Sequence, residues 1–375
     1  MEIQVFNLEK YFHQTQFYYH FFDGLFALRC ENKQLILNSL GIIPSSYRTQ
    51  RAKEITNKSS IDKLLSYFGY DDVFECQKLE DEIFLSQIYY CCYYKQNTRL
   101  KGYLEIINQK IERNNVLKPI FSLFKILIVL TLEYKEQEML DMICNDLEYI
   151  KLFYNKKYFK DDYEYLYLVI LYRLDIINSE YELDELSLKY KKLSWLYYFI
   201  KGSKAYMKEE DNKALLNYQH VLSEFRITNN LERYFIAANN VAYLYNILGE
   251  YSLSYLLTSE VIEYVFSNIE NKNRATNILM HYLFSNFMLG RYERIIEFVN
   301  IIIFDYNILN PLTAAICLIA ASKIDCLDRV KGILELEYDD FNYNVVKEYI
   351  IVKDINILRK LQNYPYYRII KENLL

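Results

Sequence analysis

The sequence predicts an all-α protein, and three observations indicate this fold class. Glycine and proline are scarce: the 375 residues contain 8 Gly and 4 Pro, whereas average proteins contain roughly 7% and 5% of them. Sheet proteins need more of both residues for their turns. Apolar residues make up 52% of the chain and recur at helical spacing along it. A pattern of two helices and a tight turn also repeats at intervals of 40 and 41 residues, which predicts an α-solenoid.

The clearest of these units runs from Arg233 to Ile262. Its apolar positions follow helical spacing up to Gly249, where the pattern breaks and then restarts. This pattern predicts a helix, a tight turn and a second helix. The small residues Ala242 and Ser254 would allow the two helices to approach each other closely.

The neighbouring units repeat the same order of residues. Downstream, the phrase FMLGRYERI matches NILGEYSLS, so that Gly290 takes the place of Gly249. Upstream, a helix pair over residues 195–225 places Ala214 where Ser254 stands. The order of a small residue, a Tyr, a turn Gly, a second Tyr and a further small residue resembles the tetratricopeptide repeat, which spans about 34 residues. The resemblance implies stacked helix pairs whose first helices line a concave surface. The alternative is an irregular helical bundle.

Helix pairs are also predicted on both sides of these units. They are expected at residues 80–94 with 100–112, 120–133 with 136–154, 163–174 with 181–190, and 313–322 with 327–336. Residues 341–375 are expected to cap the array. The tetratricopeptide-like repeat domain is therefore predicted to span residues 71–375.

Residues 1–70 are predicted to form a domain of short helices. The stretch 1–30 reads as one helix with an apolar face. Two shorter helices follow, separated by a break between Gly41 and Pro44, because Gly commonly ends a helix and Pro commonly begins one. A last helix closes at Gly69. Short helices joined by such a turn are the outline of a helix-turn-helix domain.

This segment resembles the DNA-binding domain of lambda-repressor-like (Xre-type) regulators. The resemblance lies in Leu28-Arg29 at the end of the first helix, in Leu40-Gly41-Ile42 at the turn, and in Ser46-Tyr47 at the start of the next helix. It implies that the helix after the turn binds DNA through its polar and basic side chains. These are Ser45, Ser46, Arg48, Gln50, Arg51 and Lys53.

The distribution of charge along the chain favours DNA binding by this segment. Residues 29–63 contain seven Lys or Arg and three Asp or Glu, within a chain of net charge −5. A basic patch on an acidic protein is what contacts with DNA phosphates require. The alternative is a basic face that is merely solvated.

The sequence contains no set of residues that would indicate an enzyme. Neither GxxxxGK[ST] nor GxGxxG occurs, so no phosphate-binding loop is expected. The four His residues are scattered, without the i, i+4 spacing of a helical zinc site. We therefore expect no catalytic residue, no metal site and no cofactor.

A soluble, cytoplasmic protein is expected. Residues 1–10 lack the basic and apolar regions of a secretory leader, and no apolar run reaches the ~20 residues of a membrane span. The seven cysteines include no CxxC pair, which is typical of reduced thiols in a cytosolic protein.

The repeats offer a surface for peptide binding. By the tetratricopeptide resemblance, side chains on the concave face would bind an extended peptide, with Asn side chains pairing with its main chain and aromatic side chains forming pockets. The expected peptide-binding residues are Phe199, Tyr206, Asn239, Tyr243, Asn246, Met280, Phe284 and Phe287. The alternative is that these residues pack between helices.

A helix-turn-helix followed by tetratricopeptide-like repeats resembles the peptide-pheromone receptors of Gram-positive bacteria and their phages, which act in quorum sensing. The resemblance implies a peptide-responsive transcriptional regulator with double-stranded DNA and a short signalling peptide as partners. It also implies a homodimer held together by the repeats. The alternative is a helical-repeat scaffold that binds another protein and does not contact DNA.

Overall fold

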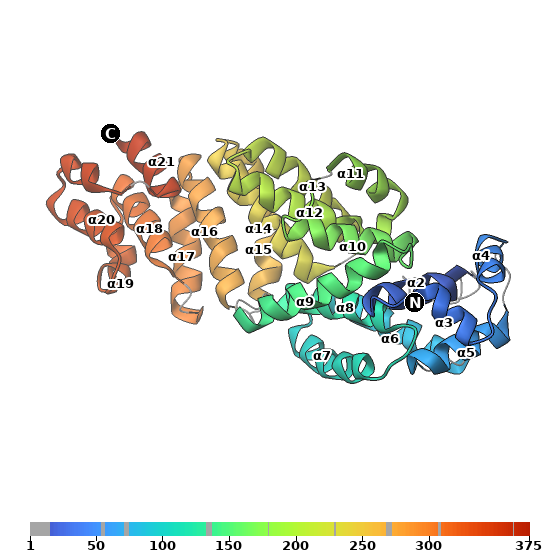
Figure 1. Ribbon diagram of the computed structural model, residues 1–375. Helices are drawn as coiled ribbons and strands as arrows, with labels where there is room; N and C mark the ends of the chain where they lie inside the picture. Colours follow the sequence, from blue (N-terminus) through green and yellow to red (C-terminus); the bar gives the residue numbers. More distant parts are fainter. Residues whose placement is uncertain are drawn as a thin grey trace. The chain divides into compact units, whose positions relative to one another are not determined.

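The computed structural model describes residues 16–53, 57–70, 75–132, 137–178, 180–228, 230–267, 272–306, 309–362 and 364–375. Within these ranges every regular element is a helix, and successive helices pack against each other (Figure 1). The predicted all-α class is confirmed. Residues 1–15 of the predicted first helix, and the predicted helix ends at 133 and 136, lie outside the described residues.

The chain divides into two compact units, residues 1–197 and residues 198–375. The division falls inside α12 (Lys191–Met207). The predicted domain boundary at residue 70 lies within the first unit and stays a prediction.

The first unit contains the four short helices and three of the predicted helix pairs. Its helices are α2 (Gln16–Leu28), α3 (Lys33–Ser39), α4 (Pro44–Lys53), α5 (Lys58–Phe68), α6 (Glu75–Tyr93), α7 (Asn97–Glu112), α8 (Lys118–Leu132), α9 (Gln137–Tyr154), α10 (Asp161–Arg173) and α11 (Glu180–Lys189). Each helix predicted between residues 80 and 190 overlaps one of these.

The short helices begin and end at the expected residues. Gly41 and Gly69 follow α3 and α5 with φ angles of 68° and 71°, in the left-handed region that ends many helices. Pro44 is the first residue of α4, and the Asn57 side chain accepts a hydrogen bond from the Ser60 N–H at the start of α5 (3.2 Å). Local capping chemistry therefore determines these four helix ends.

Helix α2 is anchored to α9 by a close contact. A Cβ atom on Gly24 would lie 2.4 Å from Cδ1 of Phe153, so only glycine allows the Phe153 ring to lie directly on the α2 backbone. Phe21 stacks on the same ring, with centroids 5.7 Å apart. The short-helix segment is thus built onto α9 through α2.

The second unit begins within α12, which together with α13–α17 forms three regular helix pairs, and shorter helices follow. It contains α13 (Asp211–Ile227), α14 (Leu231–Ile247), α15 (Tyr251–Ser267), α16 (Lys272–Met288), α17 (Tyr292–Tyr306), α18 (Pro311–Lys323), η1 (Leu327–Val330), α19 (Lys331–Leu334), α20 (Phe341–Val352), η2 (Ile355–Lys360) and α21 (Pro365–Leu374).

The predicted repeat length is confirmed by the three helix pairs. Their first helices, α12, α14 and α16, each have 17 residues and begin at residues 191, 231 and 272, so the spacing is 40 and then 41 residues. A three-residue turn joins the two helices of each pair. Its middle residue is always left-handed, with φ angles of 61° at Glu209, 82° at Gly249 and 69° at Gly290.

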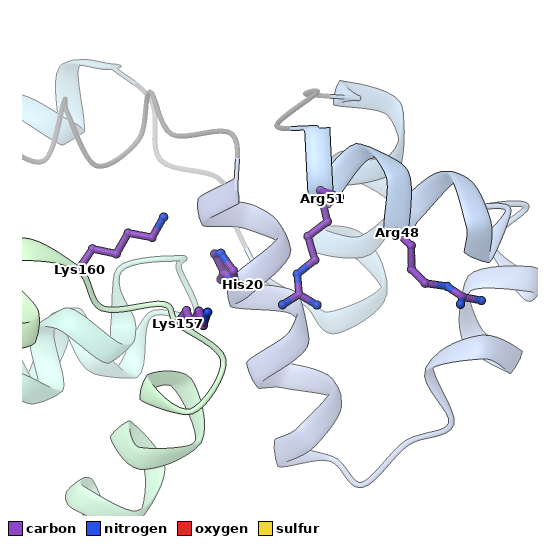
Figure 2. Close-up of a pocket in the computed structure, with 6 residues that line it drawn as sticks. His20, Arg48, Arg51, Lys157 and Lys160 are labelled. Carbon is purple, nitrogen blue, oxygen red and sulfur yellow. The ribbon is translucent and has the colours of Figure 1, made fainter.

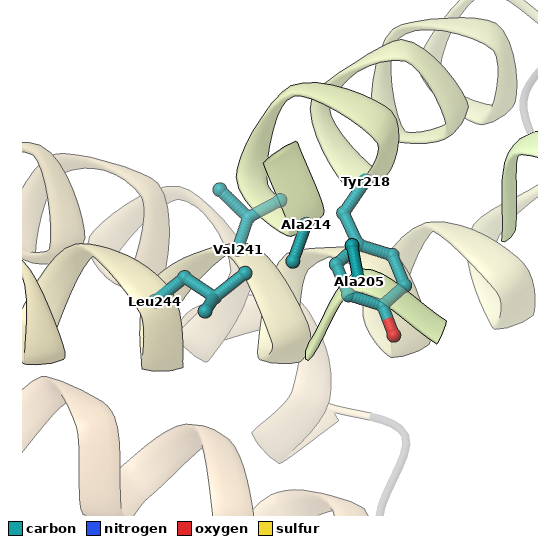
Figure 3. Close-up of a cluster of buried hydrophobic side chains, with 5 residues drawn as sticks. All are labelled: Ala205, Ala214, Tyr218, Val241 and Leu244. Carbon is teal, nitrogen blue, oxygen red and sulfur yellow. The ribbon is translucent and has the colours of Figure 1, made fainter. Parts of the chain in front are cut away.

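The small residues at the crossing of the first two pairs have the expected effect, whereas the third pair has Leu283 and Ile295 at the positions equivalent to Ala242 and Ser254. The Ser254 hydroxyl donates a hydrogen bond to the Ala242 carbonyl across the pair (3.3 Å), and both residues are fully buried. In the preceding pair, Ala205 and Ala214 lie in one cluster with Tyr218 (Figure 3). Because these side chains are small, the backbone of one helix comes within hydrogen-bond distance of a side chain of the other. This close packing requires small residues at fixed positions, and they are visible in the sequence.

The helix predicted over residues 327–336 is confirmed only in part. The segment forms the 3-10 helix η1 followed by the single turn α19. Its apolar residues Leu327, Val330 and Ile333 are three apart, which matches the three residues per turn of a 3-10 helix better than the 3.6 of an α-helix. Gly332 further weakens an α-helix here.

The equivalent turns allow a matched stability test. Because Glu209 holds a left-handed backbone at the position that Gly249 and Gly290 occupy, Glu209→Gly is expected to stabilise the protein by up to ~1 kcal/mol, and Gly249→Ala to destabilise it by ~1 kcal/mol. The measurement is urea-induced unfolding of both variants and the wild type. No atom lies within 4 Å of an added Cβ at Gly249, so equal stability of all three proteins would contradict the backbone explanation.

Candidate functional site

The predicted DNA-binding residues all lie on α4, but the structure separates them onto two faces. Ser45, Arg48 and Lys53 are exposed, whereas Ser46, Gln50 and Arg51 are partly buried. The outward face therefore presents two positive charges, and the inward face contacts the rest of the first unit.

Asp23 of α2 is the centre of the inward contacts. This carboxylate is 6% exposed and accepts an ion pair from Arg51 Nη1 at 2.7 Å through Oδ2. Its other oxygen pairs with Lys33 of α3. The Tyr47 hydroxyl donates to the same Oδ1 atom at 3.2 Å. One buried charge thus holds α2, α3 and α4 together, and Arg51 is committed to it.

Gln50 is also engaged with α2. The Tyr19 hydroxyl donates a hydrogen bond to Gln50 Oε1 (2.9 Å), and the Tyr19 ring packs edge-on against Tyr47 at 5.0 Å. Tyr47 is fully buried, and burial together with the Asp23 charge raises the pKa of its hydroxyl well above the usual value. These contacts position α4, so Gln50 and Arg51 act first as positioning residues.

A basic cavity of about 570 Å³ lies between α4, α2 and the segment after α9 (Figure 2). Its lining residues are His20, Arg48, Arg51, Ala52, Lys157 and Lys160. In Figure 2 the His20 ring lies between the two lysines and the Arg51 guanidinium, while Arg48 extends away from it. Arg48, Lys157 and Lys160 make this cavity suited to an anion such as a phosphate group, whereas the Arg51 charge is already paired with Asp23.

His20 adds no charge to this cavity at neutral pH. Burial, followed by the nearby charges of Arg51 and Lys160, lowers the pKa of the imidazole to about 4. An adjoining cavity of about 480 Å³ also has four basic lining residues (Lys33, Arg51, Lys156 and Lys157) but includes the acidic Asp23 and Glu31, whereas the His20 side has no acidic lining residue. The excess of positive charge is therefore on the His20 side. The sequence analysis did not identify Lys157 and Lys160 as site residues. The three lysines within residues 156–160 could have indicated a second basic segment.

The predicted peptide-binding residues lie on α12, α14 and α16, as expected, but their environments differ. Tyr206 is 43% exposed, and Phe199, Asn239, Tyr243 and Met280 are partly buried. Asn246, Phe284 and Phe287 are buried. The structure brings Tyr243, Asn246 and Phe284 into contact with one side chain, Tyr366 of α21. Asn239 joins them through His281, and Tyr206 through the Tyr243 hydroxyl. The structure does not bring the other three residues into this cluster.

Tyr366 is inserted among residues of α14 and α16. Its ring stacks on Phe284 with centroids 4.1 Å apart and an angle of 15°. Its hydroxyl oxygen lies 2.6 Å from His281 Nδ1 and accepts a hydrogen bond from Asn246 Nδ2 at 3.2 Å. We name these surroundings of Tyr366 (Asn246, His281, Phe284 and the adjacent Tyr243) the tyrosine seat.

The hydrogen bonds of the seat define the state of His281. Its Nε2 atom lies 3.1 Å from Asn239 Oδ1, an oxygen that can only accept, so Nε2 carries the proton. The neutral ring then leaves Nδ1 as the acceptor for the Tyr366 hydroxyl. Burial lowers the pKa of His281 to about 3, which keeps the ring neutral. Neither His281 nor Tyr366 carried a local sequence signal for this role, because 85 residues separate them.

In the described residues, no three His, Cys, Asp or Glu side chains are placed to hold a metal ion. None of the described helices is both long enough and apolar enough to cross a membrane. Comparisons with protein-family models, curated proteins and solved structures give no significant match to this chain.

The buried neutral His281 predicts a loss of stability in acid. Its pKa falls from 6.5 to about 3 on folding, so the unfolded chain binds a proton below about pH 6.5 that the folded protein excludes. The free energy of unfolding should therefore decrease by about 2 kcal/mol from this residue between pH 7.5 and pH 5. Urea unfolding of wild type and His281→Gln at both pH values measures it. The contribution of His20 is common to both proteins, so an equal pH dependence in the two would contradict the assignment.

Proposed function

We propose that the protein is a peptide-responsive transcriptional regulator that acts in the cytoplasm, with α4 binding double-stranded DNA and the repeats of the second unit binding a short signalling peptide. The observation that supports DNA binding best is the basic cavity. There, the charges of α4 are joined by Lys157 and Lys160, two residues distant in the sequence. Phosphate contacts dominate the affinity of proteins for DNA.

In this proposal the two faces of α4 have different tasks. Helices α3 and α4, joined by residues 40–43, serve as the helix-turn-helix, and the N-terminal outward residues of α4 enter the major groove. Ser45 and Arg48 are exposed there and contact the bases. Gln50 and Arg51 hold the helix against α2. Lys157 and Lys160 contact phosphate groups beside it.

The salt dependence of DNA binding tests the role of the two lysines. Once a bound site has been found by genomic DNA pull-down and sequencing, the double variant Lys157→Gln/Lys160→Gln should lower the slope of log K against log salt concentration by about 2, since each phosphate contact contributes about 0.9. Fluorescence anisotropy measures the affinity. Lys208→Gln, an exposed lysine of the second unit, is the matched control and should leave the slope unchanged.

Substitutions of Arg48 and Arg51 should have different effects on DNA affinity and on stability. Arg48→Ala should weaken binding to the specific site by ~1–3 kcal/mol while leaving stability unchanged, as expected for a base contact. Arg51→Ala should lower the melting temperature, because it leaves the buried Asp23 without one of its partners. Anisotropy and thermal melts of both variants give the result. Equal effects on binding and stability would contradict the two-face assignment.

A second candidate function is a helical-repeat scaffold that binds another protein without contacting DNA. The contacts of α4 with α2 favour it, because Asp23 neutralises the charge of Arg51 and Tyr19 binds Gln50, so that two of the six candidate DNA-binding residues are occupied. A DNA pull-down without any enriched site at moderate salt would select this function.

The regulator proposal includes a homodimer. Adjacent half-sites on one face of DNA require two recognition helices about 34–36 Å apart, and one chain supplies a single α4. Light scattering at micromolar concentration should give about twice the chain mass of 45.4 kDa. A monomer at that concentration would count against the regulator and would leave the scaffold unaffected.

A further inference from the structure

We propose that the tyrosine seat is a ligand-binding site for the tyrosine side chain of a peptide, and that Tyr366 occupies the seat until such a peptide takes its place. The inference deepens the proposed function, since it names the site and the chemistry of the signalling peptide. It rests on contacts within the second unit alone.

The seat is specific for a phenol. Two polar groups bind the same hydroxyl, one as donor and one as acceptor. Asn246 Nδ2 donates a hydrogen bond to the Tyr366 oxygen, and His281 Nδ1 accepts a hydrogen bond from the Tyr366 O–H. Phe284 supplies a parallel face for the ring. A phenylalanine would stack equally well but would leave both polar groups unpaired. Sites built to bind a hydroxyl reject the analogue that lacks it far more strongly than apolar pockets reject a missing methylene.

The seat also retains an unused acceptor. Asn246 is fully buried, and among the described residues no donor lies within hydrogen-bond distance of its Oδ1 atom. The amide that carries this oxygen points into the seat, because its nitrogen contacts Tyr366. A main-chain N–H of an extended peptide could donate to Oδ1, which no N–H group of helix α21 reaches. A peptide would therefore satisfy the seat more completely than α21 does.

Helix α21 has features of an exchangeable occupant. It has 10 residues, fewer than an isolated helix needs for stability. The Tyr367 hydroxyl is buried, and no hydrogen-bond partner for it is present in the described part of the chain, which costs stability in the seated state. Tyr243, beside the seat, contacts the exposed Tyr206 through their hydroxyls (3.2 Å), so the seat lies close to the surface.

Opening the seat by mutation tests its chemistry. In Tyr366→Ala, 4-methylphenol should bind and raise the melting temperature, whereas toluene, which has the ring without the hydroxyl, should bind at least tenfold more weakly. A synthetic peptide of residues 364–374 should bind the variant at least tenfold more tightly than the same peptide carrying Tyr366→Phe. Calorimetric titration measures all four affinities. Folded Tyr366→Ala protein that binds neither the phenol nor the peptide would overturn the proposal.

Hydrogen exchange in the wild-type protein decides the matter if Tyr366→Ala does not fold. Amide hydrogens of α21 should exchange at least tenfold faster than those of α14 and α16, because the helix leaves the seat while the repeats stay folded. Tyr366→Phe should accelerate exchange in α21 alone. Exchange of all three helices at one common rate would show that Tyr366 belongs to the fixed core and would overturn the proposal. None of these measurements involves DNA, so a failed seat and a failed DNA interface give separate results.

Discussion

The close approach of the two helices in each pair is the constraint on which the second unit depends. A single pair cannot bury its apolar face, and stacking on the next pair is what completes the core. In the middle pair, the buried crossing of Ala242 and Ser254 sets the distance between the two helices. Stacking requires the same change of chain direction between the two helices of every pair. The left-handed residue in the middle of each three-residue turn provides this change of direction. Helix length, turn and crossing thus form one unit.

These features could be predicted because they are local. The turn at Gly249, the small residues beside it and the helix ends at Gly41 and Gly69 are each determined within a few residues of sequence. The partial failure over residues 327–336 is also local, since apolar residues three apart and Gly332 favour a 3-10 helix there. The all-α class and the repeat spacing followed directly from such signals.

The candidate sites could be predicted only in part, because their geometry depends on contacts between distant residues. The basic residues of α4 were visible, but the commitment of Arg51 to Asp23 depends on how α2 packs against α4. Lys160 lies more than a hundred residues beyond α4 and still lines the same cavity. Tyr366 fills a position among repeat residues that the sequence presented as an open surface. Periodicity shows which face a residue occupies, and it carries no information on what covers that face.

The similar turns within the three helix pairs of the second unit affect how the length of such a chain can change in evolution. Because each pair has the same first-helix length and the same turn geometry, gain or loss of a whole pair keeps the packing between neighbouring pairs, provided that α14 and α16, which both contact Tyr366, stay adjacent. A shorter insertion inside a helix would rotate every following side chain away from its partner. Homologous chains should therefore differ in length by multiples of about 40 residues in this region, because this is the length of one helix pair.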